Sequence, residues 1–499
     1  MLKWISSLAL IAACGFPRPA DVLDPKSCAD GVCIDPAYPF CDEGGEITGA
    51  AQTCVAVSCT PGDFAACRGD TELSCNSAGK TYDSIQCARG CDPAIGCRLC
   101  EPNQTVCSNG KVQTCDATGA VTSSEACPLG CFEDQPRCRE IDPSNGLAAY
   151  MDMAASGPDL ILDGATLFVP LGRVIGPKGT FDLRSQMIAA SPGGAAIQVF
   201  PLRSLTVIGI VSIQQDSPHP NGVPAVAFAV YGDVKIGGTI RLDASASGDA
   251  PPGAITSGTC VGAVGHFDVS GVGYFAGSGG GGGATQGGAG GGQSFPASPG
   301  GAAFPNPDLQ PLRGGCSGGT PAGFTPGNGG GAIQITSRSS IQLRVNSTIE
   351  ANGFVGFAGI SEGLPGSESI PGGGGSGGGI LLEAPTIELD ASVMLVANGG
   401  AGTSGDSHPG LSASGRTPST GGICTLGADI CTNGGDGGSV YSPGGTASSI
   451  PFQGQQQLYT GGGGGSVGNI RINTRSGVYT KANDVFESPI PTTETIFTR

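Results

Sequence analysis

Few residues of this 499-residue chain have the type and spacing for catalysis, and two carboxylates come closest. Asp243 and Glu350 occupy equivalent positions of a repeat described below, so they would face each other on neighbouring coils about 5 Å apart. That distance suits the acid and the nucleophile of a retaining glycosidase, or two ligands of a shared cation. The alternative is that both carboxylates are solvated and point outward. We expect this second arrangement, and we assign no catalytic residue, metal or cofactor.

The histidines do not supply a catalytic base or a metal site. His219, His266 and His408 lie in separate segments, without the HxH or HExxH spacing that metal sites use. The single tryptophan, Trp4, falls in a segment that export would remove, so no indole remains to line a sugar-binding cleft. The sequence therefore favours a protein that is not an enzyme.

The first residues indicate export. Lys3 precedes an apolar run, residues 5–13, that ends in small side chains, as in a secretory signal peptide. The last residues, Ile-Ala-Ala-Cys14, resemble the bacterial lipobox, whose cysteine becomes the lipid-modified start of the mature chain. Gly15, which is not aspartate, fits sorting to the outer membrane. We predict a lipoprotein signal peptide at 1–13, lipidation of Cys14, and a lipid bilayer as partner. The alternative is an ordinary signal peptide that contains a cysteine.

Cysteine usage indicates an oxidising compartment. Without Cys14, an even 20 of the 21 cysteines remain, and most lie between Cys28 and Cys138. Twelve of them form a tandem repeat, whose two copies have six-cysteine spacings that differ by one residue in the first and last intervals. The expected division is a linker with a divergent module at 14–58, disulfide module 1 at 59–99, and disulfide module 2 at 100–140.

The modules leave some alternatives open. Six cysteines allow fifteen pairings in each copy. Zinc binding by Cys91, Cys97 and Cys100 is the rival interpretation, although export disfavours it. Arg68-Gly69-Asp70 is a possible adhesive tripeptide, which in so glycine-rich a chain is expected to be accidental.

Composition narrows the function further. The chain has 90 glycines and 37 prolines, only 13% charged residues, and a net charge of −17. Nucleic-acid binding depends on clustered basic residues, which 24 lysines and arginines in so acidic a chain do not provide. We therefore expect no nucleic acid among its partners.

A second repeat begins at residue 193, with apolar residues at x, x+2, x+8, x+10 and x+16; the fourth of its five rungs needs a one-residue deletion. The period-2 doublets predict short strands, and three strands per repeat indicate a right-handed parallel β-helix over 193–499. Residues 141–192 are expected to be a linker and an N-terminal cap, with a short helix at 147–155 over the open end. The five predicted rungs are Ile197, Val199, Leu205, Val207, Ile213; Val226, Phe228, Val234, Ile236, Leu242; Ile333, Ile335, Ile341, Leu343, Ile349; Ile380, Leu382, Ile387, Leu389, Leu395; and Ile470, Ile472, Val478, Thr480, Phe486.

Long glycine-rich insertions separate the rungs, at about 246–329, 354–376 and 400–463. Glycine suits tight turns at positive φ and lets backbones lie close together. Flexible disorder is the competing interpretation. Because each cysteine pair falls within one insertion, we predict the disulfides Cys260–Cys316 and Cys424–Cys431.

The glycine motifs carry a resemblance. Asn328-Gly-Gly-Gly-Ala-Ile333 and Gly377-Gly-Gly-Ile380 resemble the GGxI-type β-helix repeats of bacterial surface and autotransporter passenger domains. The whole layout resembles uncharacterised cysteine-rich, glycine-rich β-helix surface lipoproteins of myxobacteria. This resemblance implies architecture and not chemistry.

The function expected from the sequence is a non-catalytic cell-surface lipoprotein with an adhesive, binding or envelope-structural role. Its partner would be an unknown protein or glycan. One alternative is a carbohydrate-active β-helix enzyme, either a polysaccharide lyase or a hydrolase. Another is a protein-binding disulfide module that uses the β-helix as a spacer.

Overall fold

The chain divides into two compact units, residues 1–139 and residues 140–499, and each is described by itself. Both are mostly β, and the described residues contain one α-helix, α1 (Ala148–Ala154). Among these residues, no helix is both long and apolar enough to cross a bilayer. The computed structural model describes residues 27–28, 31–98, 100–189, 195–215, 223–242, 249–268, 274–292, 296–320, 327–360, 369–426, 431–449 and 459–499.

Unit 1 consists of small antiparallel sheets joined by disulfides. The two copies of the repeat pair their cysteines identically: first with third, second with fifth, fourth with sixth. One of the fifteen possible pairings is thus adopted twice. The strands are β1 (Phe40–Asp42), β2 (Thr53–Val55), β3 (Phe64–Arg68), β4 (Thr71–Cys75), β5 (Tyr82–Gln86), β6 (Cys91–Asp92), β7 (Gly96–Cys97), β8 (Thr105–Ser108), β9 (Lys111–Cys115) and β10 (Val121–Ala126).

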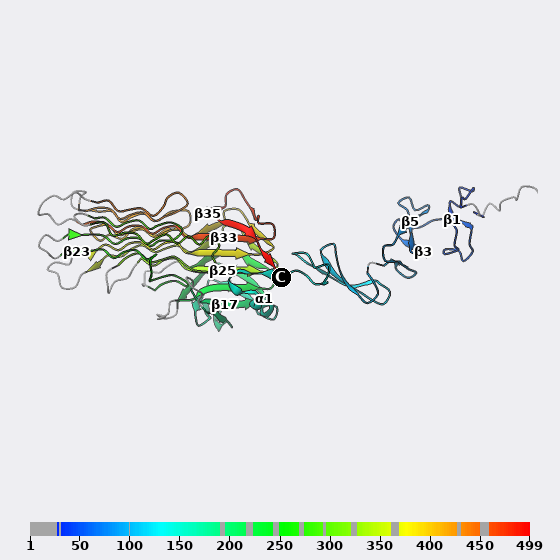
Figure 1. Cartoon of the computed structure of the whole chain (residues 1–499), viewed down its shortest axis with the longest axis horizontal. Coiled ribbons are helices and arrows are strands. Elements are labelled where there is room, and N and C mark those ends of the chain that lie inside the picture. The colour runs from blue at the N-terminus through cyan, green and yellow to red at the C-terminus, as the bar shows by residue number, and fades with distance from the viewer. Residues whose placement is uncertain are drawn as a thin grey trace, which may run out of the picture. The chain divides into compact units, whose positions relative to one another are not determined.

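Unit 2 is built on three parallel sheets, which confirms the predicted all-β class with parallel strands. From residue 197 onward, successive strands of these sheets enter the three sheets in turn, so that each passage adds one strand to each sheet (Figure 1). Before residue 197, three strands pair antiparallel at the beginning of the sheets. Apolar side chains between the sheets form one continuous core.

Each sheet keeps a regular order. Sheet one runs β16 (Gln186–Ile188), β17 (Ile197–Leu202), β20 (Ala225–Val230), β25 (Ala332–Ser337), β30 (Gly379–Glu383), β33 (Asn469–Thr474), β36 (Thr492–Thr495). Sheet two runs β12 (Asp159–Asp163), β18 (Ser204–Ile208), β21 (Val234–Ile236), β26 (Ser340–Leu343), β31 (Thr386–Leu389), β34 (Thr480–Lys481). Sheet three runs β15 (Gly179–Asp182), β14 (Arg173–Gly176), β13 (Thr166–Val169), β19 (Ile210–Gln215), β22 (Thr239–Arg241), β27 (Thr348–Glu350), β32 (Met394–Val396), β35 (Phe486–Ser488).

The predicted register holds for most neighbouring strands and fails for four pairs, β17–β20, β22–β27, β31–β34 and β32–β35. Ile333 pairs with Val226 on one side and with Ile380 on the other, as expected. In the first rung, however, Phe200 and not Val199 aligns with Phe228. Both faces of β17 are buried, because α1 packs on its outer side, so an alternating apolar pattern could not choose between them.

In the last rung, Ile470 and Ile472 align as predicted, whereas the second and third strands are shifted by one residue. Leu389 aligns with Lys481 and not with Thr480, and Val478 is 71% exposed. Tyr479 packs against the core in its place. A polar group closes this end of the core: the Tyr479 hydroxyl donates to Glu487, and the Lys481 ammonium group lies 2.7 Å from the same carboxylate.

Part of the region expected to be linker and cap, residues 159–188, contributes strands to the three sheets. Leu167 of β13 pairs in parallel with Ile213, so the stack begins before residue 193. Helix α1 was expected over the open end, but it lies on the side, against β17 and β20. The unit's two termini meet where β11 (Ile141–Asp142) pairs with β37 (Phe497–Thr498).

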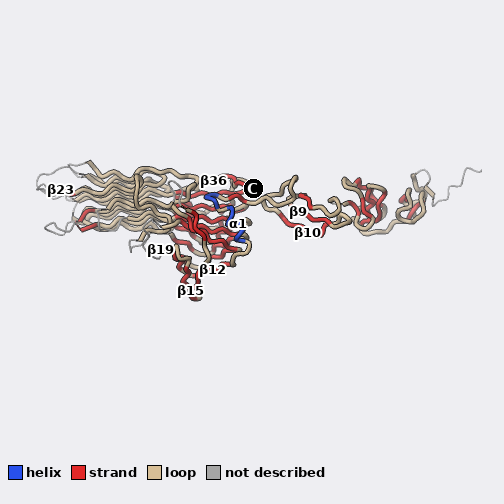
Figure 2. Tube along the Cα trace, turned by 60° about the horizontal axis from the view of Figure 1, so that its bottom comes forward, coloured by secondary structure: helices blue, strands red, loops and turns tan. Residues whose placement is uncertain are grey.

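The insertions run away from the sheets as long segments side by side (Figure 2). Two short hairpins occur in them, β23 (Phe267–Asp268) with β24 (Tyr274–Phe275), and β28 (Gly359–Ile360) with β29 (Ser369–Ile370). Strand β23 lies at the end of the unit remote from α1 (Figure 1).

Candidate functional site

The three insertions pack into one body, which we call the glycine array. Its centre consists of three glycine runs, residues 277–283, 372–378 and 461–468, one from each insertion. All residues of these runs are buried. The described parts of the insertions are therefore a packed structure and not a set of solvated loops.

Hydrogen bonds in the first run repeat every three residues. The N–H groups of Gly277 and Gly280 donate to segment 287–292, with distances of 3.1 and 2.9 Å. Those of Ser278 and Gly281 donate to Pro371, just before the second run, and to Gly374 within it. Those of Gly279 and Gly282 donate to residues 260–263. Such a period matches an extended helix with three residues per turn, whose N–H groups point about 120° apart.

Carbonyl groups of the same run bond to three further segments. Ser278 and Gly281 accept from residues 463 and 466 of the third run, at 2.8 and 2.9 Å. Gly279 accepts from residue 319, and Gly280 from residue 301. The run therefore has six hydrogen-bonded neighbours, and its buried peptide groups find partners without a β-sheet.

This packing explains why most positions of these runs are glycine. A Cβ on Gly281 would lie closer than 3.0 Å to the backbone carbonyl of Cys316, and one on Gly374 would meet the carbonyl of Gly400 in the same way. Backbone cannot move aside as a flexible side chain can. The expected reason was half wrong: residues 279–283 do not adopt positive φ, and the close approach of backbones is what requires glycine.

The structure joins both cysteine pairs of the insertions. Cys260 and Cys316 form a disulfide, with Cα atoms 5.8 Å apart, inside the first insertion. Cys424 and Cys431 form another in the third insertion. Cys14 lies outside the described residues.

The candidate catalytic pair is corrected. Glu350 aligns with Arg241 and not with residue 243, because the register of β22 and β27 is shifted by two residues from the expected one. Arg241 Nε lies 3.0 Å from Glu350 Oε2, and the Gly415 N–H donates to Oε1 at 3.3 Å. Asp243 itself lies outside the described residues. Glu350 thus has a structural ion-pair partner.

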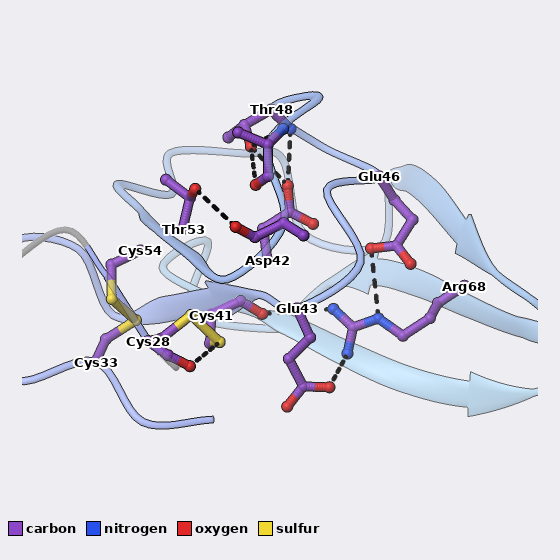
Figure 3. Close-up of a disulfide and its surroundings, with 12 residues drawn as sticks. Cys28, Cys33, Cys41, Asp42, Glu43, Glu46, Thr48, Thr53, Cys54 and Arg68 are labelled. Atoms are coloured by element: carbon purple, nitrogen blue, oxygen red, sulfur yellow. Dashed lines mark hydrogen bonds and ion pairs between the residues drawn. A yellow bond between two sulfur atoms is a disulfide. The ribbon is translucent and has the colours of Figure 1, made fainter. Parts of the chain in front are cut away.

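The zinc and adhesive-tripeptide alternatives also lose support. Cys91, Cys97 and Cys100 are all in disulfides, so they offer no thiolate to a metal. Arg68 lies between two carboxylates of the divergent module, 3.0 Å from Glu43 and 3.5 Å from Glu46 (Figure 3). Its guanidinium is therefore engaged within unit 1 and is not displayed.

A set of exposed apolar side chains lies within residues 411–426 of the third insertion. We call it the array edge: Leu411 (72% exposed), Ile423 (70%) and Leu426 (53%), beside the disulfide Cys424–Cys431. The two segments that carry it are paired, because the Leu411 N–H donates to the Thr420 carbonyl at 2.8 Å. Sequence reasoning missed this edge, since lone apolar residues among glycines show no period.

A carboxylate fixes the turn beneath the array edge. Asp406 accepts from the Ser404 hydroxyl (2.5 Å), the Thr425 N–H (2.7 Å) and His408 Nδ1 (3.1 Å). Burial alone would raise the pKa of Asp406, but these hydrogen bonds outweigh it and lower the pKa well below its usual range.

These three side chains do not form a catalytic triad. The Ser404 hydroxyl donates to Asp406 and accepts from the backbone N–H of His408 at 3.0 Å, so this serine is not hydrogen-bonded to the imidazole. A serine nucleophile needs the histidine ring as its base. Ser404, Asp406 and His408 therefore stabilise the turn that they form.

The ten disulfides indicate an oxidising, extracytoplasmic environment. No protein-family model, curated protein or solved structure matches this chain.

Proposed function

We propose that this protein is a non-catalytic surface protein, in which the glycine array holds the array edge rigidly for contact with another surface component. The observation that carries the proposal is a set of largely exposed apolar side chains on a body whose backbone is hydrogen-bonded throughout its centre. Exposed apolar clusters on soluble proteins mark interaction sites. A rigid support lowers the entropy lost on binding.

The same proposal includes the architecture and the anchor. We infer that the three parallel sheets wind as a right-handed β-helix, since successive strands enter them in a fixed rotation. We also infer that Cys14 carries lipid and attaches the mature chain to the outer membrane or cell surface. Metabolic labelling with a fatty acid tests the anchor: the label should enter the protein and be lost in Cys14→Ala. A labelled Cys14→Ala chain would contradict it.

Binding is tested with the mature chain on arrays of immobilised proteins and glycans. The variant Leu411→Ser/Ile423→Ser/Leu426→Ser should lose at least about tenfold in affinity, because it removes the apolar anchors from the centre of the contact. The matched control is Val478→Ser/Ile490→Ser, which changes two apolar residues that are each 71% exposed elsewhere on unit 2. Equal binding by the edge variant and the wild type would refute the proposed surface.

Catalysis is the competing function, and it has a separate test. The mature chain should show no turnover on a panel of acidic and neutral polysaccharides, with or without Ca²⁺. Turnover that disappears in Glu350→Gln would replace our proposal with an enzyme. Loss of stability without any activity in that variant agrees with the ion pair to Arg241.

A further inference from the structure

A cavity of about 970 Å³ lies at the beginning of the stack, where all three sheets end. The terminal strands are β12 in sheet two, β15 in sheet three and β16 in sheet one, and each contributes residues to its lining. Figure 2 shows β12 and β15 on the side of unit 2 opposite β36, a strand of the last passage. The cavity therefore lies at the end of the three sheets that is formed by β12, β15 and β16.

The floor and one wall of this cavity are apolar. Leu160 and Leu183 are buried at its base, whereas Ile161 is 56% exposed and Phe181 is 43% exposed. Met153, just before the end of α1, adds a further partly exposed side chain. So much exposed apolar surface around one cavity is unusual for a surface with no partner.

The free edge of β12 faces this cavity. Two bonds to the neighbouring strand fix its orientation: Arg203 N–H donates to the Pro158 carbonyl, and Gly164 N–H donates to the Ile208 carbonyl. In a parallel strand the N–H and C=O groups of one residue point to the same side, and successive residues alternate. The peptide groups of residues 159, 161 and 163 therefore point away from sheet two, toward the unpaired edge.

The charges around the cavity are unbalanced. Asp159 is held by Arg203, whose Nε lies 3.0 Å from Oδ1, and Asp182 is held by Arg173 at 3.2 Å. Among the described residues, the exposed lysine Lys178 and the exposed arginine Arg184 form no ion pair. In a chain with a net charge of −17, this opening is locally cationic.

We propose that this cavity binds an extended acidic and apolar peptide segment of a partner protein, which adds a strand to the free edge of β12. Main-chain bonds to residues 159–163 would supply affinity, and alternate side chains would enter the apolar floor. Carboxylates on the peptide would face Lys178 and Arg184. This site is separate from the array edge and does not depend on the function proposed for it.

The test uses the mature chain and a fluorescently labelled six-residue peptide of alternating valine and glutamate, measured by fluorescence anisotropy. We expect saturable binding that falls at least about tenfold in Ile161→Pro, because proline removes the N–H donor of the free edge and is tolerated on an edge strand. Lys178→Glu/Arg184→Glu should show a similar loss. Lys235→Glu, an exposed charge change on β21 outside the cavity, is the matched control.

Several outcomes would overturn the proposal. One is no binding up to about 1 mM, which corresponds to roughly −4 kcal/mol. Equal binding of a valine–lysine peptide would remove the charge argument. Displacement of the peptide by dodecanoate together with unchanged binding in Ile161→Pro would identify a site for anionic amphiphiles. Concentration-dependent dimers that Ile161→Pro abolishes would assign the edge to a second copy. Circular dichroism of each variant excludes unfolding as the cause of a loss.

Discussion

The stack, which consists of the three parallel sheets and the core between them, belongs to the same compact unit as the glycine array. The two regions bury their backbones by opposite means. In the stack, side chains such as Phe200 and Phe228, with ring centroids 5.6 Å apart, fill the space between the sheets. In the array, the runs around Gly281 and Gly374 contain almost no side chains, and peptide groups of six neighbouring segments satisfy one another. Buried apolar side chains stabilise the stack, whereas the array can pack closely only because its residues have almost no side chains.

The largest effect is expected where the stack loses volume. Phe228→Ala should reduce the free energy of unfolding by about 3–5 kcal/mol, because the ring is fully buried and its removal leaves a cavity. Pulse proteolysis of the full chain in urea measures the change. Phe497→Ala, at a position 65% exposed, should change it by less than about 0.5 kcal/mol. Equal effects of the two substitutions would place the core elsewhere.

The disulfides of the glycine array should contribute nearly as much to the free energy of unfolding. The disulfide Cys260–Cys316 spans 56 residues, so its removal by Cys260→Ser/Cys316→Ser should cost about 4 kcal/mol in the chain-entropy model. Cys424–Cys431 spans only 7 residues, and its removal should cost about 2.5 kcal/mol in the same model. Non-reducing peptide mapping establishes the two pairs first. Bridges from these cysteines into unit 1 would contradict the structure.

The third effect is a loss of stability when a side chain is added inside the glycine array. Gly281→Ala should destabilise unit 2 by about 1–3 kcal/mol, since the new methyl group meets backbone that cannot move aside. Gly237 in the stack is the matched control, because a Cβ there would lie 3.7 Å from the Val207 carbonyl, an ordinary contact. Gly237→Ala should leave stability nearly unchanged. If both substitutions are tolerated alike, the array is not close-packed.

The smallest effect is expected to be a loss of local stability around Asp406 as the pH falls. Because the folded-state pKa of Asp406 is lowered, its contribution to stability is complete above the unfolded value, about 3.9, and is lost as the pH falls below it. Hydrogen exchange in residues 404–426, corrected for the intrinsic pH dependence, should therefore lose protection at pH values below about 3.9. Asp406→Asn should abolish that pH dependence. A pH-independent segment in the wild type would show that the carboxylate does not brace the turn.

The sequence predicted the stack better than the array for a physical reason. Alternating apolar residues such as Ile333 and Ile335 carry a period that fixes which face is buried, so the central register followed directly. At β17 both faces are apolar, and near Tyr479 the inward side chains are polar, so the same rule failed by one residue. The pairing of Glu350 was wrong by two residues, a shift that keeps the same face inward.

The array had no comparable signal. A glycine run has no side-chain period, and the hydrogen-bond partners of Gly281, which are Gly374 and Ser466, lie in two other runs far away in the sequence. Composition therefore allowed tight turns, disorder and close packing equally well. Neither the array edge nor the cavity beside β12 follows from spacing, because both depend on which segments lie side by side.

Hydrogen–deuterium exchange of the protein tests most directly whether backbone hydrogen bonds hold the array together. The glycine runs 277–283, 372–378 and 461–468 should be protected to an extent comparable with strands β25 and β30, since their N–H groups are buried and bonded to neighbouring segments. Exchange of these runs at the rate of an unstructured chain, while β25 and β30 stay protected, would contradict the account.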